Sequence, residues 1–159
     1  MLKINVVAVG RIKEQALSAL IGEYVKRLGR YCAFRIIEVP DESIPARESS
    51  ATVMKRLSDE AGRVLGRLRA DAYVIALDIG GKSPGSIELA QMINALAGRF
   101  SEIFIVIGGS HGLHPDVLSR SDYILSMSKM TFPHQLARLI LLEQLYRSFK
   151  IINNEIYHK

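Results

Sequence analysis

The sequence predicts an α/β fold in which a parallel sheet is covered by helices on both faces. Short runs rich in β-branched and apolar residues alternate along the chain with longer stretches of helical periodicity. The short runs are apolar almost without interruption, which is typical of strands buried on both faces. At 159 residues, with 48% hydrophobic and 23% charged residues, the chain can form one substantial core. We therefore expect a single domain over residues 1–159.

The expected elements alternate in order along the chain. Strands are predicted at 2–9, 34–39, 73–78, 103–107 and 123–125, and helices at 17–28, 49–68, 83–96, a short stretch from 115, and 133–150. Ser49 or Ser50 is expected to cap the second helix, and Ser83 followed by Pro84 to begin the third. The inward faces of the first three helices are expected to include Leu20, Met54 and Ile87. Residues 40–50, with two prolines and clustered polar side chains, are expected to form a loop.

Three of the predicted strands run into segments of small residues. These segments are 80–82 (Gly-Gly-Lys), the pair Gly108 and Gly109, and residues 126–131. Glycine lets a backbone approach a ligand closely, although each segment alone is more often a tight turn. Because the carboxyl ends of parallel strands meet at one edge of a sheet, we expect the three segments to share a ligand pocket.

The composition of these segments indicates which ligand the pocket holds. Neither glycine segment has the spacing of a phosphate-binding loop or of a dinucleotide fingerprint. The segment 127–132 contains one cation, Lys129, whereas a triphosphate calls for more cations and an aspartate for magnesium. A phosphate-free cofactor that contains adenosine fits better, and S-adenosylmethionine is the obvious one. A dehydrogenase is a weaker alternative that depends on Gly10 and Glu38 alone.

Two charged residues, Glu143 and Arg147, lie four apart on the last predicted helix, which is otherwise apolar nearly all round. They are either an ordinary surface pair or anchors of a site, since charges on a mostly buried helix are costly unless paired. Both interpretations stay open from the sequence. The apolar helix itself is expected to be buried by its own domain or by a partner.

Several classes of protein are disfavoured by the composition. A single cysteine excludes a disulfide framework, and the four histidines form no metal-binding pair, so we expect no metal. No apolar run is long enough to span a membrane, and the short apolar N-terminus lacks a cleavage site, so we expect a cytoplasmic protein. The net charge of +5 is compatible with a polyanionic partner or with a solvated basic surface.

Eight segments in order along the chain carry a resemblance to a known family. They are VVAVGRIKE, EYVKRL, IIEVPDE, LDIGGK, IGGSHGL, LSMSKMTFPHQLAR, EQLYRSFKI and YHK. With these segments the chain resembles, over essentially its whole length, the RlmH family of SPOUT-class methyltransferases. Enzymes of this family methylate N3 of a pseudouridine in large-subunit (23S) ribosomal RNA.

The resemblance implies a parallel-sheet α/β knot whose C-terminal segment forms a trefoil, and a homodimer packed through the last helix. It implies S-adenosylmethionine as cofactor. Because the domain is small and shows no evident RNA-binding appendage, we expect its target to be the assembled ribosome or large subunit, bound through a basic surface that both chains of the dimer form. The cofactor contacts that the resemblance implies are Leu77, Gly108, Met127, Ser128, Lys129, Met130, Thr131 and Phe132, to which the strand-end argument adds Gly109. The alternative is a non-catalytic ribosome-associated or nucleotide-binding module.

The implied reaction requires a group that removes the proton from N3 of the base. The candidates for base handling and substrate placement are Glu143 and Arg147 on the last helix, with Tyr157 and His158 in the C-terminal tail. A histidine in a tail is usually only solvated, so His158 is one candidate among these and solvent is another.

Overall fold

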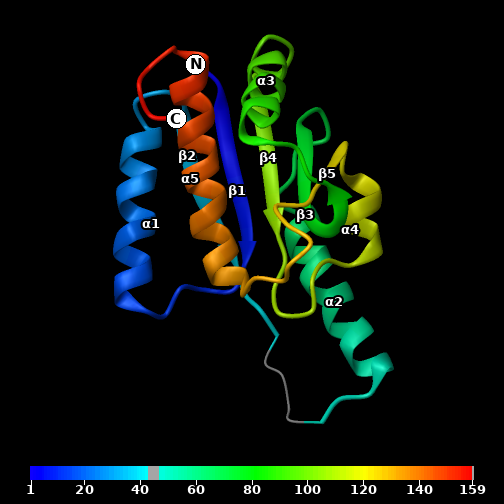
Figure 1. Cartoon of the computed structure of the whole chain (residues 1–159). Coiled ribbons are helices and arrows are strands. Elements are labelled where there is room, and N and C mark those ends of the chain that lie inside the picture. Colours follow the sequence, from blue (N-terminus) through cyan, green and yellow to red (C-terminus); the bar gives the residue numbers. More distant parts are fainter. Residues whose placement is uncertain (43–46, 159) are drawn as a thin grey trace.

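The computed structural model describes residues 1–42 and 47–158 and shows a five-stranded parallel sheet in the order β2-β1-β4-β3-β5 (Figure 1). The elements in chain order are β1 (Lys3–Val9), α1 (Gln15–Leu28), β2 (Ala33–Val39), α2 (Ser50–Leu65), β3 (Tyr73–Lys82), α3 (Ser86–Ala97), β4 (Glu102–Ile107), α4 (Pro115–Arg120), β5 (Tyr123–Leu125) and α5 (His134–Ile152). The predicted α/β class and the order of its elements are confirmed. Of the expected loop at 40–50, residues 43–46 lie outside the described residues.

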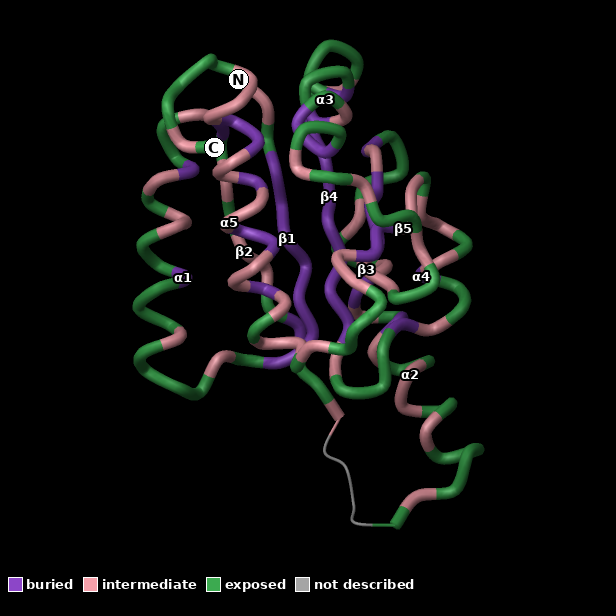
Figure 2. The backbone as a smooth tube through the Cα atoms, viewed as in Figure 1, coloured by how far each residue is buried: buried purple, intermediate pink, exposed green. Residues whose placement is uncertain are grey.

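The central strands of the sheet are buried along most of their length (Figure 2). Their alternate side chains enter two separate cores, one on each face of the sheet. On one face, Val6 and Ile105 pack with the apolar sides of α1, α3 and α5. On the other face, Val7 and Val106 pack with α2 and α4. The only cysteine, Cys32, is free and fully buried in the first of these cores.

The third strand extends further than the sequence predicts. Residues 80–82 were expected to form a loop, but they belong to β3, and Lys82 pairs with Leu125 after a shift of register. A side chain at Gly81 would place its Cβ 2.5 Å from the carbonyl oxygen of Ile124, so glycine is needed for this close approach of β3 to β5. The backbone N–H of Ser126 donates to Lys82 O at 2.8 Å, which fixes the start of the segment that follows β5.

The structure confirms the predicted cap of α2 but corrects the start of α3 and the faces of the first three helices. Ser49 caps α2 by accepting a hydrogen bond from the Thr52 N–H, as expected. The expected start of α3 at Ser83 is wrong, because Gly85 is the cap and its N–H donates to the Glu88 carboxylate at 2.7 Å. The inward placement of three residues is also wrong, since their side chains are largely exposed: Leu20, Met54 and Ile87.

The last helix lies across one face of the sheet between α1 and α3 (Figure 1). Its buried side consists of Leu141, Leu142, Leu145 and Phe149, together with the fully buried Arg138. Its N-terminal end lies near the carboxyl ends of the strands, and the C-terminal tail lies near the opposite end of the molecule. No helix in the described part of the chain has both the length and the apolar character needed to cross a membrane.

Candidate functional site

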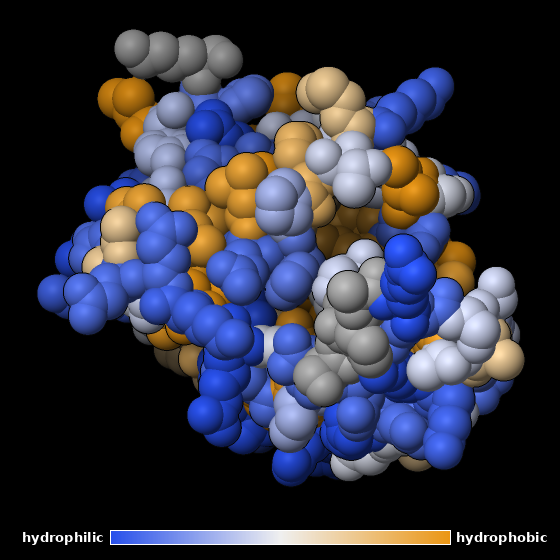
Figure 3. Space-filling view, turned by 90° about the horizontal axis from the view of Figure 1, so that it is seen from below, coloured by the Kyte–Doolittle hydropathy of each residue, from blue (hydrophilic) through white to orange (hydrophobic). Residues whose placement is uncertain are grey.

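A large pocket lies at the carboxyl ends of β3, β4 and β5 and has a volume of about 620 Å³. The middle of β3 contributes Leu77, Asp78 and Ile79. The last residue of β4, Ile107, contributes together with Gly108 and Gly109, which follow it. The segment after β5 and the first turn of α5 close the pocket. Figure 3 views this edge of the molecule, where apolar side chains gather across the middle and hydrophilic ones border them. Volume and apolar lining are typical of a small-molecule site.

Eight of the nine predicted cofactor residues line this pocket: Leu77, Gly108, Gly109, Met127, Ser128, Met130, Thr131 and Phe132. The ninth, Lys129, is exposed and does not line the pocket. The glycine segment at 80–82 does not line it either, contrary to the expectation of three convergent loops. Its contribution is indirect, through the hydrogen bond from Ser126 to Lys82.

The glycine turn after β4 brings backbone against backbone at the pocket wall. A Cβ at Gly108 would lie 2.4 Å from the carbonyl oxygen of Gly112, so no other residue fits without moving the turn. Gly112 has φ +77°, a conformation that favours glycine. Its N–H donates to Gly109 O at 3.1 Å, which closes the turn. The wall at this point is therefore bare backbone, available to a ligand.

The segment that follows β5 is held in shape by its own hydroxyl groups. Ser126 Oγ donates to the carbonyl of Ser128 at 3.0 Å, and the N–H of Met130 donates to Ser128 Oγ at 3.0 Å. Ser126 is buried, whereas Met130 is 71% exposed. The local hydrogen bonds thus give a mostly exposed wall of the pocket a defined backbone path.

Two titratable residues that the sequence reasoning missed also line the pocket. Asp78 follows Leu77 on β3, and its Oδ1 accepts a hydrogen bond from the Gly80 N–H at 2.8 Å. His134 is the first residue of α5. Burial, together with the nearby Arg138 guanidinium, lowers the pKa of His134 below its usual value, so the imidazole is neutral at pH 7. Asp78 directly follows Leu77, and His134 lies two residues after Phe132. This closeness to predicted cofactor contacts was the signal in the sequence that pointed to both residues.

Arg138 fixes the helix that carries His134. Its Nη1 lies 2.6 Å from Glu38 Oε1, and its Nη2 donates to the carbonyl of Gly10 at 2.9 Å. Glu38 and Gly10 stand at the ends of β2 and β1, so the arginine joins α5 to the carboxyl edge of the sheet. Gly10 and Glu38, the two residues on which the dehydrogenase alternative depends, are thus both bound by the buried Arg138 side chain.

The four predicted catalytic residues form one cluster at the far end of α5. Arg147 Nη2 lies 2.6 Å from Glu143 Oε1, and Tyr157 OH donates to the same oxygen at 3.2 Å. His158 Nδ1 lies 3.3 Å from Arg147 Nη1. Burial, followed by hydrogen bonding to Tyr24 and the charge of Glu143, raises the pKa of Tyr157 to about 12. Hydrogen bonding to Glu143 raises the pKa of Arg147.

The pocket and this cluster do not meet within one chain. None of the four residues lines the pocket, whose furthest residue on α5 is Ala137. Arg147 lies ten residues beyond Ala137, which corresponds to roughly 15 Å along a helix. Within one chain the cofactor candidates and the catalytic candidates therefore lie apart, an arrangement compatible with a site shared between the two chains of the expected homodimer.

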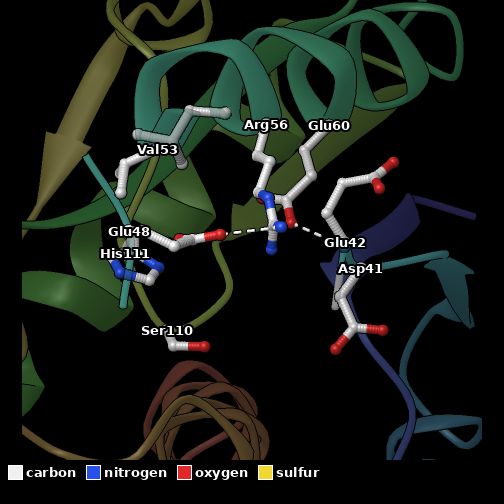
Figure 4. Close-up of a pocket in the computed structure, with 9 residues that line it drawn as sticks. Asp41, Glu42, Glu48, Val53, Arg56, Glu60, Ser110 and His111 are labelled. Atoms are coloured by element: carbon white, nitrogen blue, oxygen red, sulfur yellow. Dashed lines mark hydrogen bonds and ion pairs between the residues drawn. The ribbon is translucent and has the colours of Figure 1, made fainter. Parts of the chain in front are cut away.

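A second, much smaller hollow opens between α2 and the segment after β2, and Figure 4 shows Glu48 and Arg56 pointing toward each other there. Arg56 Nη2 lies 2.7 Å from Glu48 Oε1. The hollow measures about 10 Å³, room for about one water molecule. No group of three or more metal-binding side chains occurs within the described ranges. The large pocket is therefore the candidate site.

The fold and the pocket together define an α/β protein that binds a small molecule at the carboxyl edge of a parallel sheet. A family described as "Predicted SPOUT methyltransferase" matches residues 2–158. The chain belongs to this SPOUT methyltransferase family.

Two full-length relatives are half identical to this chain. A protein of Bifidobacterium adolescentis named ribosomal RNA large subunit methyltransferase H is 50% identical, over 99% of this chain and 100% of its own length. A protein of Methanococcus maripaludis named putative ribosomal RNA large subunit methyltransferase H is 51% identical, over 99% of this chain and 100% of its own length.

Proposed function

We propose that this protein is an S-adenosylmethionine-dependent methyltransferase that acts on N3 of a pseudouridine in large-subunit (23S) ribosomal RNA. The observation that carries the proposal is the pocket of about 620 Å³ at the strand ends of a SPOUT methyltransferase. Among the described residues, its lining includes no lysine or arginine. The two relatives named for large-subunit rRNA methylation support the substrate. The trefoil knot implied by the family resemblance stays a prediction.

The residues present fit the cofactor. The pocket size suits a nucleoside with a short side chain, and its lining is mostly apolar, hydroxylic or glycine backbone. Gly108 has no side chain, and any side chain there would collide with Gly112. An adenosyl group could therefore lie directly against the backbone at this position. Leu77, Met127 and Phe132 would supply apolar walls. The segment after β5, whose backbone is held by the hydroxyls of Ser126 and Ser128, would offer backbone hydrogen bonds.

The cofactor supplies an already activated methyl group, so the protein mainly has to align the acceptor and exclude water. The apolar wall formed by Leu77, Ile107 and Leu125 would exclude water from the methyl group. Ser126 and Ser128 would keep the pocket wall in one conformation, the first by donating to the Ser128 carbonyl and the second by accepting from the Met130 N–H. The backbone at Gly108 and Gly109 would orient the bound nucleoside.

The acceptor nitrogen must lose a proton before or during transfer. Tyr157 is a poor acceptor at neutral pH, since it keeps its own proton with a pKa of about 12 and donates to Glu143. Glu143 already accepts from Arg147, Gln144 and Tyr157. Among the four side chains this leaves His158, which we propose as the proton acceptor in preference to solvent, with Arg147 and Tyr157 positioning the nucleobase.

A homodimer would bring the tail cluster of one chain to the pocket of the other. The outward side of α5 and the start of α3 expose Leu136 (40%) and Ile87 (51%), large apolar side chains that a second copy would cover. The site would then be built from two chains. Such a dimer would also join two basic surfaces, since each chain carries a net charge of +5. A ribosomal substrate would place the protein in the cytoplasm.

Two measurements test the proposal. Isothermal titration should show binding of S-adenosylmethionine, and absence of binding would favour the non-catalytic ribosome-associated or nucleotide-binding module. Mass spectrometry of rRNA nucleosides should show a methylated pseudouridine only after incubation of ribosomes with active protein. Free rRNA serves as the comparison, because equal activity on free rRNA would contradict recognition of the assembled particle.

A further inference from the structure

The pocket lining contains an acidic and a basic side chain that differ in charge at neutral pH. Of the described residues that line the pocket, Asp78 alone is acidic and His134 alone is basic. The other lining residues are apolar, hydroxylic or glycine. Asp78 is half-buried, so its carboxylate acts on a bound charge more strongly than a fully exposed one would.

The carboxylate of Asp78 is held in a defined position. Its Oδ1 accepts from the Gly80 N–H at 2.8 Å, and a Cβ at Gly80 would lie only 3.1 Å from that oxygen. Glycine at position 80 thus lets the carboxylate lie against the backbone of β3. Its Oδ2 has no hydrogen-bond partner within the described part of the chain, so one oxygen is free to face a ligand.

The imidazole of His134 does not offset this negative charge at neutral pH. Burial and the adjacent Arg138 lower the pKa of His134, and the opposing effects of Asp41 and Glu60 are smaller. His134 therefore adds no positive charge that would balance the carboxylate of Asp78 in the pocket lining.

The methyl donor and its product differ by one unit of charge. When the S–CH₃ bond breaks, its electron pair stays on sulfur, so the cationic sulfonium becomes a neutral thioether. All other groups, including the amine, the carboxylate and the adenosine, are the same in S-adenosylmethionine and S-adenosylhomocysteine. A protein group that tells the two apart must therefore respond to the charge on sulfur or to the methyl group itself.

We propose that Asp78 is the residue that makes the pocket prefer the charged methyl donor over its neutral product. The inference rests on the proposed function, because it requires that the pocket bind this cofactor. The carboxylate stabilises the sulfonium form through its charge and loses that interaction once the methyl group has been transferred. Asp78 thereby limits inhibition by the product and favours exchange of the product for a new donor.

Titration calorimetry of the full-length protein at pH 8 with each ligand tests the proposal. For Asp78→Asn, the Kd for S-adenosylmethionine should rise on the order of tenfold, whereas that for S-adenosylhomocysteine should change by less than about threefold. The control is Asp59→Asn, which removes an equal charge from an exposed position on α2 and should change neither Kd. If thermal melts show that Asp78→Asn is unfolded under these conditions, the same titrations are made with Asp78→Ser, whose hydroxyl oxygen can still accept from the Gly80 N–H.

Two outcomes would overturn the proposal, and they are distinguishable from failure of the proposed function. Equal weakening of both ligands would mean that Asp78 contacts a group common to them, such as the amine or the ribose. No weakening of either would remove Asp78 from the binding site. If the unmodified protein binds neither ligand, the proposed function itself is wrong, and the inference falls with it.

Discussion

Arg138 and Glu38 form an ion pair in which one partner is buried and the other half open to water. The side chain of Arg138 is 1% exposed and that of Glu38 is 37% exposed, with Nη1 and Oε1 2.6 Å apart. The pair joins α5 to the end of β2, and Arg138 also binds the carbonyl of Gly10. The buried cation depends on its two acceptors, whereas Glu38 could be solvated alone.

We expect Glu38→Gln to lower the free energy of unfolding by about 2–3 kcal/mol, because it leaves the Arg138 charge buried without its counter-charge. The matched control is Glu23→Gln, which breaks the exposed pair with Arg27 and should cost less than about 1 kcal/mol. Urea denaturation measures both. Equal costs would show that burial of Arg138 does not matter.

Gly108→Ala should abolish detectable cofactor binding, since its Cβ would lie 2.4 Å from the Gly112 carbonyl oxygen and displace the turn at the pocket wall. The control is Gly22→Ala on α1, where a Cβ meets nothing within 4 Å. That variant should bind the cofactor normally and gain up to about 1 kcal/mol of stability from helix propensity. Calorimetry gives the affinities, and normal binding by Gly108→Ala would remove this turn from the site.

Deletion of Tyr157 to Lys159 should abolish methyl transfer and leave cofactor binding unchanged, because we place the tail at the acceptor nucleobase and it lines no part of its own chain's pocket. The two readouts are turnover on ribosomes and calorimetric affinity. Retained turnover would exclude Tyr157 and His158 from the mechanism.

If the site is built from two chains, two inactive variants should complement each other. Mixing Gly108→Ala with the tail deletion, under conditions that exchange subunits, should restore part of the activity in dimers that combine one intact pocket with one intact tail. Each variant alone provides the baseline. Absence of any recovery, with exchange verified by native mass spectrometry, would place the whole site in one chain.

The stability of the protein should fall on acidification from pH 7.5 to 5.5. The folded pKa of His134 lies below the value of 6.5 for an unperturbed histidine, so the unfolded state binds the proton more readily. The contribution is fully present above about pH 6.5 and is lost as the pH falls toward the folded pKa. His134→Gln should show a smaller loss over this range in thermal melts. Arg138 on α5 favours the effect, while Asp41 and Glu60 oppose it. An unchanged pH profile in the variant would contradict it.

Much of the fold follows from patterns that are local in sequence. The strands 3–9 and 102–107 are nearly continuous apolar runs, and the Ser49 cap is a local hydrogen bond, so these features could be predicted. The extension of β3 through residue 82 could not, because it depends on backbone contact with β5 more than forty residues later. The exposure of Ile87 has the same kind of cause, since helix faces are set by what packs against them.

The candidate site shows the same division between local and distant causes. Glycines and hydroxyl residues at strand ends indicated the pocket, and most of them line it. Asp78 and His134 adjoin those segments but have no distinctive spacing, so their place in the lining depends on tertiary structure. The distance between the pocket and the tail cluster could not be predicted from residue patterns, because these give the faces of a helix but not what lies at each of its ends. The family resemblance, which implies a dimer packed through the last helix, was the feature that pointed to a site shared by two chains.

The only cysteine offers a measurable consequence of the packing. Burial raises the pKa of Cys32 to about 12, and the side chain is fully enclosed, so the reactive thiolate is nearly absent while the core stays closed. Modification by a thiol reagent would therefore proceed only through rare openings of the layer beneath α1 and α5. The rate of modification of Cys32 would therefore measure how often those openings occur, with no engineered label.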